Sequence, residues 1–299
     1  CYLEIRKIIR DYKPDIVHTH AAKPGALGRI AAIMEGVPLI FHTFHGHVFH
    51  SYFNKLKSYL FLIIERFLAK KSTNIIAISG SQKHELVNKY KVANNKKVKV
   101  IPLGFDLSKF QKNKKIKRDK FRNEFKLNSN VIVIGLIGTL TAIKNQKLFL
   151  DSSKYILDNI NKNVKFFLIG DGDDRDKLIN YSKSLNLSTY DFFSQFKDLN
   201  KSIFFTSWRK DIDYVMSGLD IVCLTSFNEG TPVSLIEAQA GNKPVVSTNV
   251  GGISDIVKNN VTGLVVDSFD YKEYGKNLLE LIENDNLRLK MSKDGFEFI

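Results

Sequence analysis

Short runs of β-branched and aromatic residues alternate with amphipathic helical patterns along the chain, and this alternation limits the fold more than any other feature. A repeated strand–helix–strand series predicts a parallel sheet with helices packed on both of its faces. The series occurs twice, so we predict an α/β protein of two doubly wound Rossmann-like domains that face a cleft. In the first half, strands are predicted at 15–19, 39–43, 74–78 and 97–101, and helices at 24–35, 56–69 and 81–90. In the second half, strands are predicted at 131–137, 165–169, 203–206, 220–224 and 244–247, and helices at 146–160, 173–185 and 232–240.

The composition changes between Gln111 and Asn130, where Lys, Arg and Asn are dense and apolar residues are few before Phe121. We therefore predict a first domain at 1–112, a basic linker with a short surface helix at 113–130, and a second domain at 131–299. The chain opens with Cys1 rather than Met, inside a helical pattern. We expect the first domain to be incomplete at its N-terminal side.

The net charge is strongly positive, because 45 Lys and Arg against 31 Asp and Glu leave +14. Such a charge favours an anionic partner, which can be a nucleic acid, an anionic membrane face or a phosphorylated substrate. Helix-turn-helix, RNA-recognition and zinc-finger patterns are absent, so we expect no nucleic-acid partner. The two cysteines do not form a disulfide framework, which favours a reducing compartment. The apolar run Tyr59–Ile64 is too short to span a bilayer.

The segment from Asn228 to Ala238 follows a predicted strand and carries the most informative pattern. Thr231 can cap a helix whose first turn suits Pro232, and the N-terminus of that helix offers free N–H groups to an anion. Gly230 allows a ligand to approach the backbone closely. Glu229 and Glu237 can each accept hydrogen bonds from two hydroxyls of a sugar or ribose diol. The alternative is a capped surface helix with two solvated glutamates.

A second glycine loop, Gly135–Asn145, leads from a strand into a helix and carries one cation at the turn, Lys144. Lys144 can meet a phosphate, and Gly138 and Thr139 line the turn. An ordinary strand–helix turn explains the same residues. Three further segments follow strands in this half, and since all meet the carboxyl edge of one sheet, we expect them to share a ligand. They are Gly170-Asp171-Gly172, the stretch Phe205–Arg209, in which Trp208 and Arg209 could frame a flat base, and Gly251-Gly252.

Histidines gather in the first half, at positions 18, 20, 42, 45 and 47. A zinc site would need a complete ligand set, and no cysteine is available, so we expect hydrogen bonds to a sugar or phosphate instead of a metal. His18 alternates with Val17 inside a strand and is predicted to be structural. Lys23 and Arg29, at the start of the next helix, are predicted to place cations near the same edge.

These residues, taken in order, resemble the GT-B glycosyltransferases, specifically the retaining group called glycosyltransferase family 4. Glu229 and Glu237 resemble the E-x7-E motif of that group. The segments that flank this motif, and further segments in both halves, also match that group. Within the group, the chain resembles the subgroup that builds bacterial surface polysaccharides. The matching segments are Gly230-Thr231-Pro232, Ala240-Gly241, Pro244-Val245-Val246, Gly251-Gly252, Asp255-Ile256-Val257, Thr262-Gly263-Leu264-Val265, His18-Thr19-His20, Gly28-Arg29 and Thr43-Phe44-His45-Gly46-His47.

The resemblance implies a nucleotide-diphosphate sugar as donor substrate, bound mainly by the second domain, with no cofactor and no tightly bound metal. It implies that Lys144 contacts the diphosphate, Glu229 the donor sugar and Glu237 the ribose, while His45 faces the donor sugar from the first domain. It also implies retention of anomeric configuration, with the leaving diphosphate helping to deprotonate the acceptor. The backbone expected to approach the sugar and phosphates is that of Thr231, Pro232, Val233, Ser234 and Leu235.

Three departures from the family pattern bear on activity. Thr139 stands where the group often has Arg, which leaves Arg209 as the candidate for a second phosphate cation. The glycine-rich loop expected in the first domain is absent, and the C-terminal crossing helix is missing or truncated at Ile299. We therefore expect part of the acceptor site to be missing from this chain.

Two other functions stay open at this point. A sugar-nucleotide 2-epimerase shares two facing Rossmann-like domains, and it differs in needing no acceptor. A nucleic-acid-binding protein would be driven by the charge alone, and a salt-titrated DNA-binding assay separates it. For the glycosyltransferase we expect a glycan or lipid-linked acceptor and a cytoplasmic location on the inner membrane face. Lys55, Lys57, Lys70 and Lys71 flank the helix 56–69 and are candidates for contact with anionic lipid, unless this helix packs on the sheet and its lysines are solvated.

Overall fold

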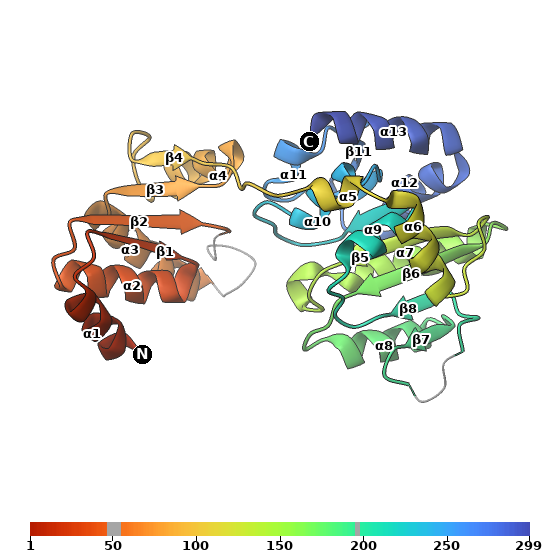
Figure 1. Cartoon of the computed structure of the whole chain (residues 1–299), viewed down its shortest axis with the longest axis horizontal. Helices are drawn as coiled ribbons and strands as arrows, with labels where there is room; N and C mark the ends of the chain where they lie inside the picture. Colours follow the sequence, from red (N-terminus) through yellow and green to blue (C-terminus); the bar gives the residue numbers. More distant parts are fainter. Residues whose placement is uncertain (47–54, 195–197) are drawn as a thin grey trace. The chain divides into compact units, whose positions relative to one another are not determined.

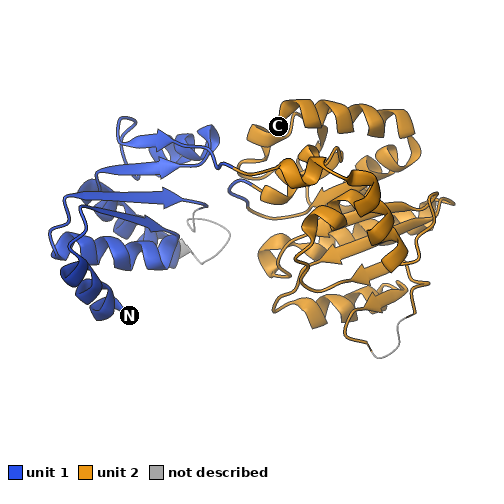
Figure 2. Cartoon of the chain, in the orientation of Figure 1, with its two compact units in different colours: residues 1–104, 229–231 blue, residues 105–228, 232–299 orange. Residues whose placement is uncertain are grey.

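The computed structural model describes residues 1–46, 55–194 and 198–299, and the chain divides into two compact units (Figures 1 and 2). Unit 1 comprises residues 1–104 with 229–231, and unit 2 comprises residues 105–228 with 232–299. Among the described helices, none is both long and apolar enough to cross a bilayer.

Unit 1 contains four parallel strands that lie side by side in chain order, β1-β2-β3-β4. The register pairs His18 with Phe41 and His20 with Thr43, so the carboxyl ends of β1 and β2 meet at one edge. The parallel α/β architecture predicted for this half is confirmed, and each strand lies within about two residues of its predicted position. The strands are β1 (Ile16–His20), β2 (Leu39–Phe44), β3 (Asn74–Ala77) and β4 (Val98–Val100).

The helices of unit 1 connect these strands. Because the strand order advances in one direction, right-handed crossovers bring α2 and α3 to the same face, where they contact each other. The reversal of strand order that would place helices on both faces does not occur among the described strands of unit 1. The helices are α1 (Tyr2–Tyr12), α2 (Ala22–Met34), α3 (Lys55–Lys71) and α4 (Gly80–His84), which continues as the π-helical turn η1 (Glu85–Lys89).

A buried ion pair joins α2 to α3 in unit 1. The Arg29 guanidinium is fully buried and donates to both carboxylate oxygens of Glu65, at 2.8 and 2.7 Å. Burial raises the pKa of Glu65, against the opposing charge of Arg29. The prediction that Arg29 supplies a cation at the strand edge is therefore wrong, since its charge is used between two helices.

Unit 2 contains seven parallel strands in the order β11-β10-β9-β5-β6-β8-β7. The chain first builds outward from β5 to β6, β7 and β8 and then returns to the other side of β5, which makes this sheet doubly wound as predicted. The strands β7 and β11 were not predicted. The strands are β5 (Ile132–Ile137), β6 (Val164–Ile169), β7 (Thr189–Asp191), β8 (Ile203–Phe205), β9 (Ile221–Leu224), β10 (Val245–Thr248) and β11 (Gly263–Val266).

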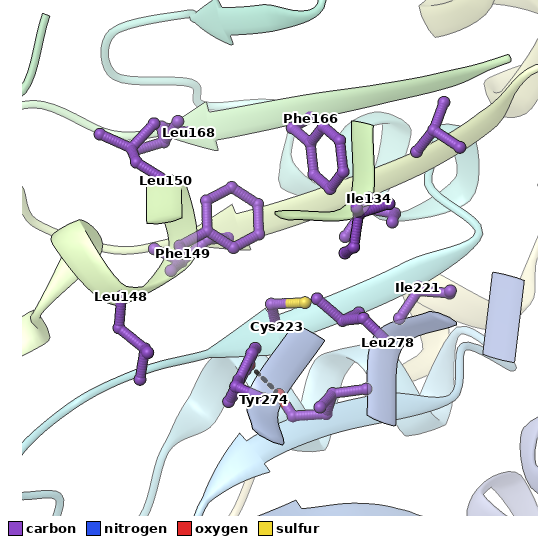
Figure 3. Packing of buried hydrophobic residues seen from close by; sticks show 14 of the residues in the cluster. Ile134, Leu148, Phe149, Leu150, Phe166, Leu168, Ile221, Cys223, Tyr274 and Leu278 are labelled. Carbon is purple, nitrogen blue, oxygen red and sulfur yellow. Dashed lines mark hydrogen bonds between the residues drawn. The ribbon is translucent and has the colours of Figure 1, made fainter. Parts of the chain in front are cut away.

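Side chains alternate between the two faces of the unit 2 sheet, and each face has its own apolar core. On β5, Ile134 faces a core that includes Phe149, Cys223 and Tyr274 (Figure 3). Val133, its neighbour on β5, faces the opposite core, in which the rings of Phe167 and Phe204 are stacked. The helices are α5 (Ser108–Gln111), α6 (Lys114–Glu124), α7 (Gln146–Asn159), α8 (Arg175–Ser184), α9 (Ile212–Gly218), α10 (Val233–Ala240), α11 (Ile253–Ile256), α12 (Tyr271–Glu283) and α13 (Asp285–Phe298).

The basic segment predicted as a linker groups with unit 2. Phe121 and Arg122 of α6 are buried, and Arg122 donates to the Asp220 carboxylate at 2.6 Å. The predicted boundaries differ because α6 packs against α9. In addition, Arg118 and Arg122 of this segment pair with Asp220, about 100 positions further along the chain.

Candidate functional site

The loop after β5 carries Lys144 at the carboxyl edge of the unit 2 sheet. Ala142–Lys144 form one 3₁₀ turn, and Asn145 adopts a left-handed conformation before α7 begins. The Thr225 hydroxyl donates to the Lys144 carbonyl at 2.9 Å. The Phe227 amide donates to the Ile143 carbonyl at 2.8 Å. The loop of Lys144 is therefore held by the segment that follows β9, and the predicted strand–loop–helix order is confirmed.

Glycines allow a second loop to pack directly against the first one. Gly170 has a φ of +140°, and a Cβ added there would lie 2.0 Å from the carbonyl oxygen of Gly138. A Cβ at Gly172 would lie 2.4 Å from the carbonyl oxygen of Leu140. The turn 170–172 therefore needs glycine for close backbone approach. Gly138 itself has open space beside it, since the nearest atom to an added Cβ is Lys144 Cε at 4.0 Å.

A third loop, after β8, joins the same edge. The Gly170 amide donates to the Ser207 carbonyl at 3.1 Å, and the Ser207 hydroxyl donates to Asp171 at 2.8 Å. The sequence pattern does not single out Ser207, which adopts a left-handed φ of 61° in this loop. Trp208 follows and is 62% exposed, so its ring is accessible at this edge. Of the segments that were predicted to share a ligand, 170–172 and 205–209 thus lie together with the loop of Lys144. The third, Gly251-Gly252, leads into α11.

Arg209 does not serve this edge as a phosphate cation. Its guanidinium donates to the carboxylates of Glu124 and Asp211, each at 2.8 Å. These hydrogen bonds, Glu124 first, raise its pKa above the ordinary value. A guanidinium held by two carboxylates has little charge to offer an anion, so the prediction for Arg209 is corrected.

The helix α10 begins one residue later than predicted and without the predicted cap. Pro232 is the capping residue, while the Thr231 hydroxyl oxygen is buried and makes no hydrogen bond to the described residues. The Leu235 amide donates to the Pro232 carbonyl at 3.1 Å, so it is already used within the helix. Of the predicted backbone donors, those of Val233 and Ser234 lie in the first turn, where amides lack intrahelical partners.

The two glutamates of the motif occupy different surroundings. Glu229 is partly buried in the loop 229–231, which groups with unit 1, and Gly230 lies beside it. Glu237 lies on α10 in unit 2. Burial raises the pKa of Glu237, and the positive charge of Lys109 opposes this effect. A partly buried carboxylate of this kind is suited to accept hydrogen bonds from paired hydroxyls.

In unit 1, His42 is structural and His45 is exposed. His42 Nδ1 lies 2.9 Å from the Thr19 hydroxyl, and burial lowers the pKa of His42 to about 3. His18, which was predicted to be structural, is exposed and lies 2.8 Å from the Thr43 hydroxyl. His45 lies just beyond β2, and His47 lies outside the described residues. No group of three metal-ligating side chains forms among residues 1–46, 55–194 and 198–299.

Comparison with known proteins assigns both halves of the chain to one enzyme class. Residues 117–298 match the family described as "Glycosyl transferases group 1", and residues 1–109 match "Glycosyltransferase Family 4". The chain is 32% identical over 296 residues to an Escherichia coli "UDP-Gal:alpha-D-GlcNAc-diphosphoundecaprenol alpha-1,3-galactosyltransferase", covering 98% of this chain and 72% of that protein. It is 29% identical to "Capsular polysaccharide biosynthesis glycosyltransferase CapM" of Staphylococcus aureus, covering 95% of this chain and 71% of that protein.

A solved structure supports the fold. The crystal structure of Anabaena HepE in complex with UDP-glucose superposes with a TM-score of 0.82 at 20% identity, covering 99% of this chain and 76% of that chain. The epimerase alternative is not favoured by these matches. The two family matches and the 32% identical relative show that this chain belongs to the group 1 glycosyltransferases, the family-4 type with the GT-B fold.

Proposed function

We propose that this chain is a retaining, metal-independent hexosyltransferase that moves a sugar from a nucleotide-diphosphate donor to a glycan or lipid-linked acceptor in surface-polysaccharide synthesis. The observation that carries the proposal is the joining of the loops 138–144, 170–172 and 206–209 at one sheet edge, with Lys144 on the first of them. The relatives named above act on a diphosphoundecaprenol-linked sugar or in capsule synthesis, which supports the acceptor class.

Each residue has a distinct role in the proposed reaction. Lys144 stabilises the charge that develops on the leaving diphosphate, and the first-turn amides of α10 assist it. Glu229 accepts from hydroxyls of the donor sugar, and Glu237 accepts from the ribose. His45 forms a hydrogen bond to the donor sugar. Since Arg209 is paired with two carboxylates, Lys144 carries more of the diphosphate charge than in relatives with an arginine at position 139.

Substitution of Lys144 and of Glu229 tests the donor site. Removal of one charged contact to a transition state costs about 2–4 kcal/mol, so Lys144→Ala and Glu229→Ala should each lower turnover at least about a hundredfold. Turnover is measured as UDP release from UDP-galactose in the presence of a lipid-linked acceptor. The control is Lys147→Ala, which removes an exposed lysine from α7 three positions further on. Near-normal turnover in both site variants would reject the assignment.

We also propose that unit 1 docks on an anionic membrane through α3. Five large apolar side chains of α3 are between 45% and 78% exposed, and their spacing of three or four residues places them on one helix face. The helix α3 therefore has apolar residues on two faces, because Leu68 is buried while Leu60, Ile63 and Phe67 are exposed. Exposed apolar residues flanked by lysines are typical of helices that lie in a membrane interface. The exposed residues are Leu56, Tyr59, Leu60, Ile63 and Phe67.

A further inference from the structure

Three imidazole rings stand next to one another at the carboxyl edge of the unit 1 sheet. His18 and His20 lie on β1, and their ring centroids are 4.4 Å apart. The ring of His45, just after β2, lies 5.1 Å from that of His20. Parallel pairing of β1 with β2 creates this row, because it brings His20 opposite Thr43, two residues before His45.

His20 and His45 are joined directly by their ring nitrogens. His20 Nδ1 lies 2.9 Å from His45 Nε2, which is a hydrogen-bond distance. Such a contact needs a single hydrogen atom between the two nitrogens. A neutral imidazole carries its proton on one nitrogen only, so the bond couples the tautomers of the two rings. When His20 donates, the proton of His45 must lie on Nδ1, and when His45 donates, its Nδ1 holds a lone pair.

The electrostatic surroundings disfavour protonation of His45 and His18. Partial burial lowers the pKa of His45, and the charge of His20 lowers it further. Burial lowers the pKa of His18 in the same way, with contributions from His20 and His45. His42, on β2, has its own pKa lowered by burial and by Arg29, and its interaction with His45 is repulsive when both are charged. Each positive charge added to this row of imidazoles therefore opposes the protonation of its neighbours.

We propose that His20 is a positioning residue, which fixes the ring orientation and tautomer with which His45 meets the donor sugar. This inference rests on the proposed role of His45. The other nitrogen of His45, Nδ1, is then the atom left to meet a sugar hydroxyl. Without His20, the His45 ring samples both tautomers and loses the contact that fixes its orientation.

The test uses the whole chain and compares His20→Ala with His20→Asn. The asparagine amide occupies nearly the place of Nδ1 and can still donate to His45, whereas alanine cannot. The first measurement is ¹⁵N NMR of the His45 ring across pH, assigned by the signal that His45→Gln removes. In His20→Ala we expect mixed tautomers and a higher pKa for His45, because a neighbouring positive charge is lost. In His20→Asn the wild-type tautomer should return.

The second measurement is the rate of UDP release from UDP-galactose. His20→Ala should lower kcat about tenfold, the loss expected for one hydrogen bond, and should move the acidic limb of the pH profile to higher pH. His20→Asn should recover most of kcat. The control is His84→Ala, which removes an exposed histidine of α4 that contacts Asn88.

Two results would overturn the inference, and they differ from each other. If His20→Ala leaves the tautomer and the pKa of His45 unchanged, the coupling of the two rings is wrong. If the tautomer moves but His45→Ala retains full turnover, the coupling holds and the proposed contact of His45 with the sugar fails, which removes the positioning role of His20.

Discussion

The carboxyl edge of the unit 2 sheet is formed mainly by backbone, and that of the unit 1 sheet mainly by side chains. In unit 2 the edge is a set of backbone loops, in which Gly170 approaches Gly138 and Thr225 holds the Lys144 carbonyl. In unit 1 the edge is a row of histidine side chains above the buried His42.

This difference predicts different sensitivities in the two units. A backbone-built edge depends on the conformations and close approaches that only glycine permits, and its hydrogen bonds between amides and carbonyls do not titrate near neutral pH. An edge built from imidazoles is sensitive to acid, because an imidazole gains a positive charge when it binds a proton. Acid, a glycine substitution in unit 2 and substitutions on α3 test this contrast between the units.

Acidification should destabilise unit 1 through His42. The pKa of His42 is about 3 in the folded chain against an ordinary value of 6.5, so between these values the unfolded chain binds more protons. The free energy of unfolding therefore falls as pH falls from 6.5 toward 3, by up to about 1.4 kcal/mol per pH unit. Hydrogen exchange of the whole chain, followed separately for β2 and β5 between pH 7 and 5, measures the effect in each unit.

The matched variant for this prediction is His42→Asn, which can keep the hydrogen bond to Thr19 but cannot titrate. Its β2 amides should show much less acid sensitivity than those of the wild type. Equal acid sensitivity of β2 and β5 in the wild-type chain would contradict the contrast between the units.

Gly170→Ala should destabilise unit 2. The added Cβ would lie 2.0 Å from the Gly138 carbonyl oxygen at a φ of +140°, so the loop must move. Overpacking and backbone strain each cost about 1–3 kcal/mol, and we expect a loss of about 3 kcal/mol in the free energy of unfolding. Denaturant titration measures it. Gly80→Ala is the control, because no atom lies within 4 Å of its added Cβ, and it should leave stability unchanged or slightly raised.

Membrane binding should depend on unit 1 and on salt. Each lysine near an anionic leaflet contributes about 1 kcal/mol, so Lys70→Gln should weaken binding to vesicles containing phosphatidylglycerol about fivefold. Phe67→Gln should weaken it as well, by removing an exposed apolar side chain of α3. Cosedimentation at low and high salt measures the binding, which high salt should abolish.

The control for membrane binding is Leu289→Gln on α13 of unit 2, where leucine is 69% exposed. This variant should bind vesicles as the wild type does. Equal binding to neutral vesicles, or no binding to either kind, would leave a water-soluble acceptor as the better proposal.

Much of the fold could be predicted because its signals are local. The alternation of β-branched runs and helical patterns located most strands of both sheets and the strand–loop–helix order around Lys144. The short strands β7 and β11 were missed, although β4 and β8, with three residues each, were located. The glycines at 170 and 172 marked a turn, although the atoms that require them, in residues 138 and 140, lie about 30 positions earlier.

The two misplaced arginines share one cause, which is pairing with distant carboxylates. Arg209 was predicted to bind phosphate, but it meets Glu124, 85 positions earlier. Arg29 was predicted to lie at the sheet edge, but it meets Glu65, 36 positions later. Charge pairs of this kind leave no spacing pattern in a sequence, because either partner could face solvent.

The α/β class, the two series of strands and helices, and the family motifs could therefore be predicted from local patterns in the chain. These properties depend on residues that are near one another in the chain, so periodicity and spacing record them. Which cations pair internally, and the contact of His20 with His45, became visible in the folded chain alone. Side chains 25 positions apart come within 2.9 Å only after two strands pair in one register, and that register depends on the packing of the whole sheet.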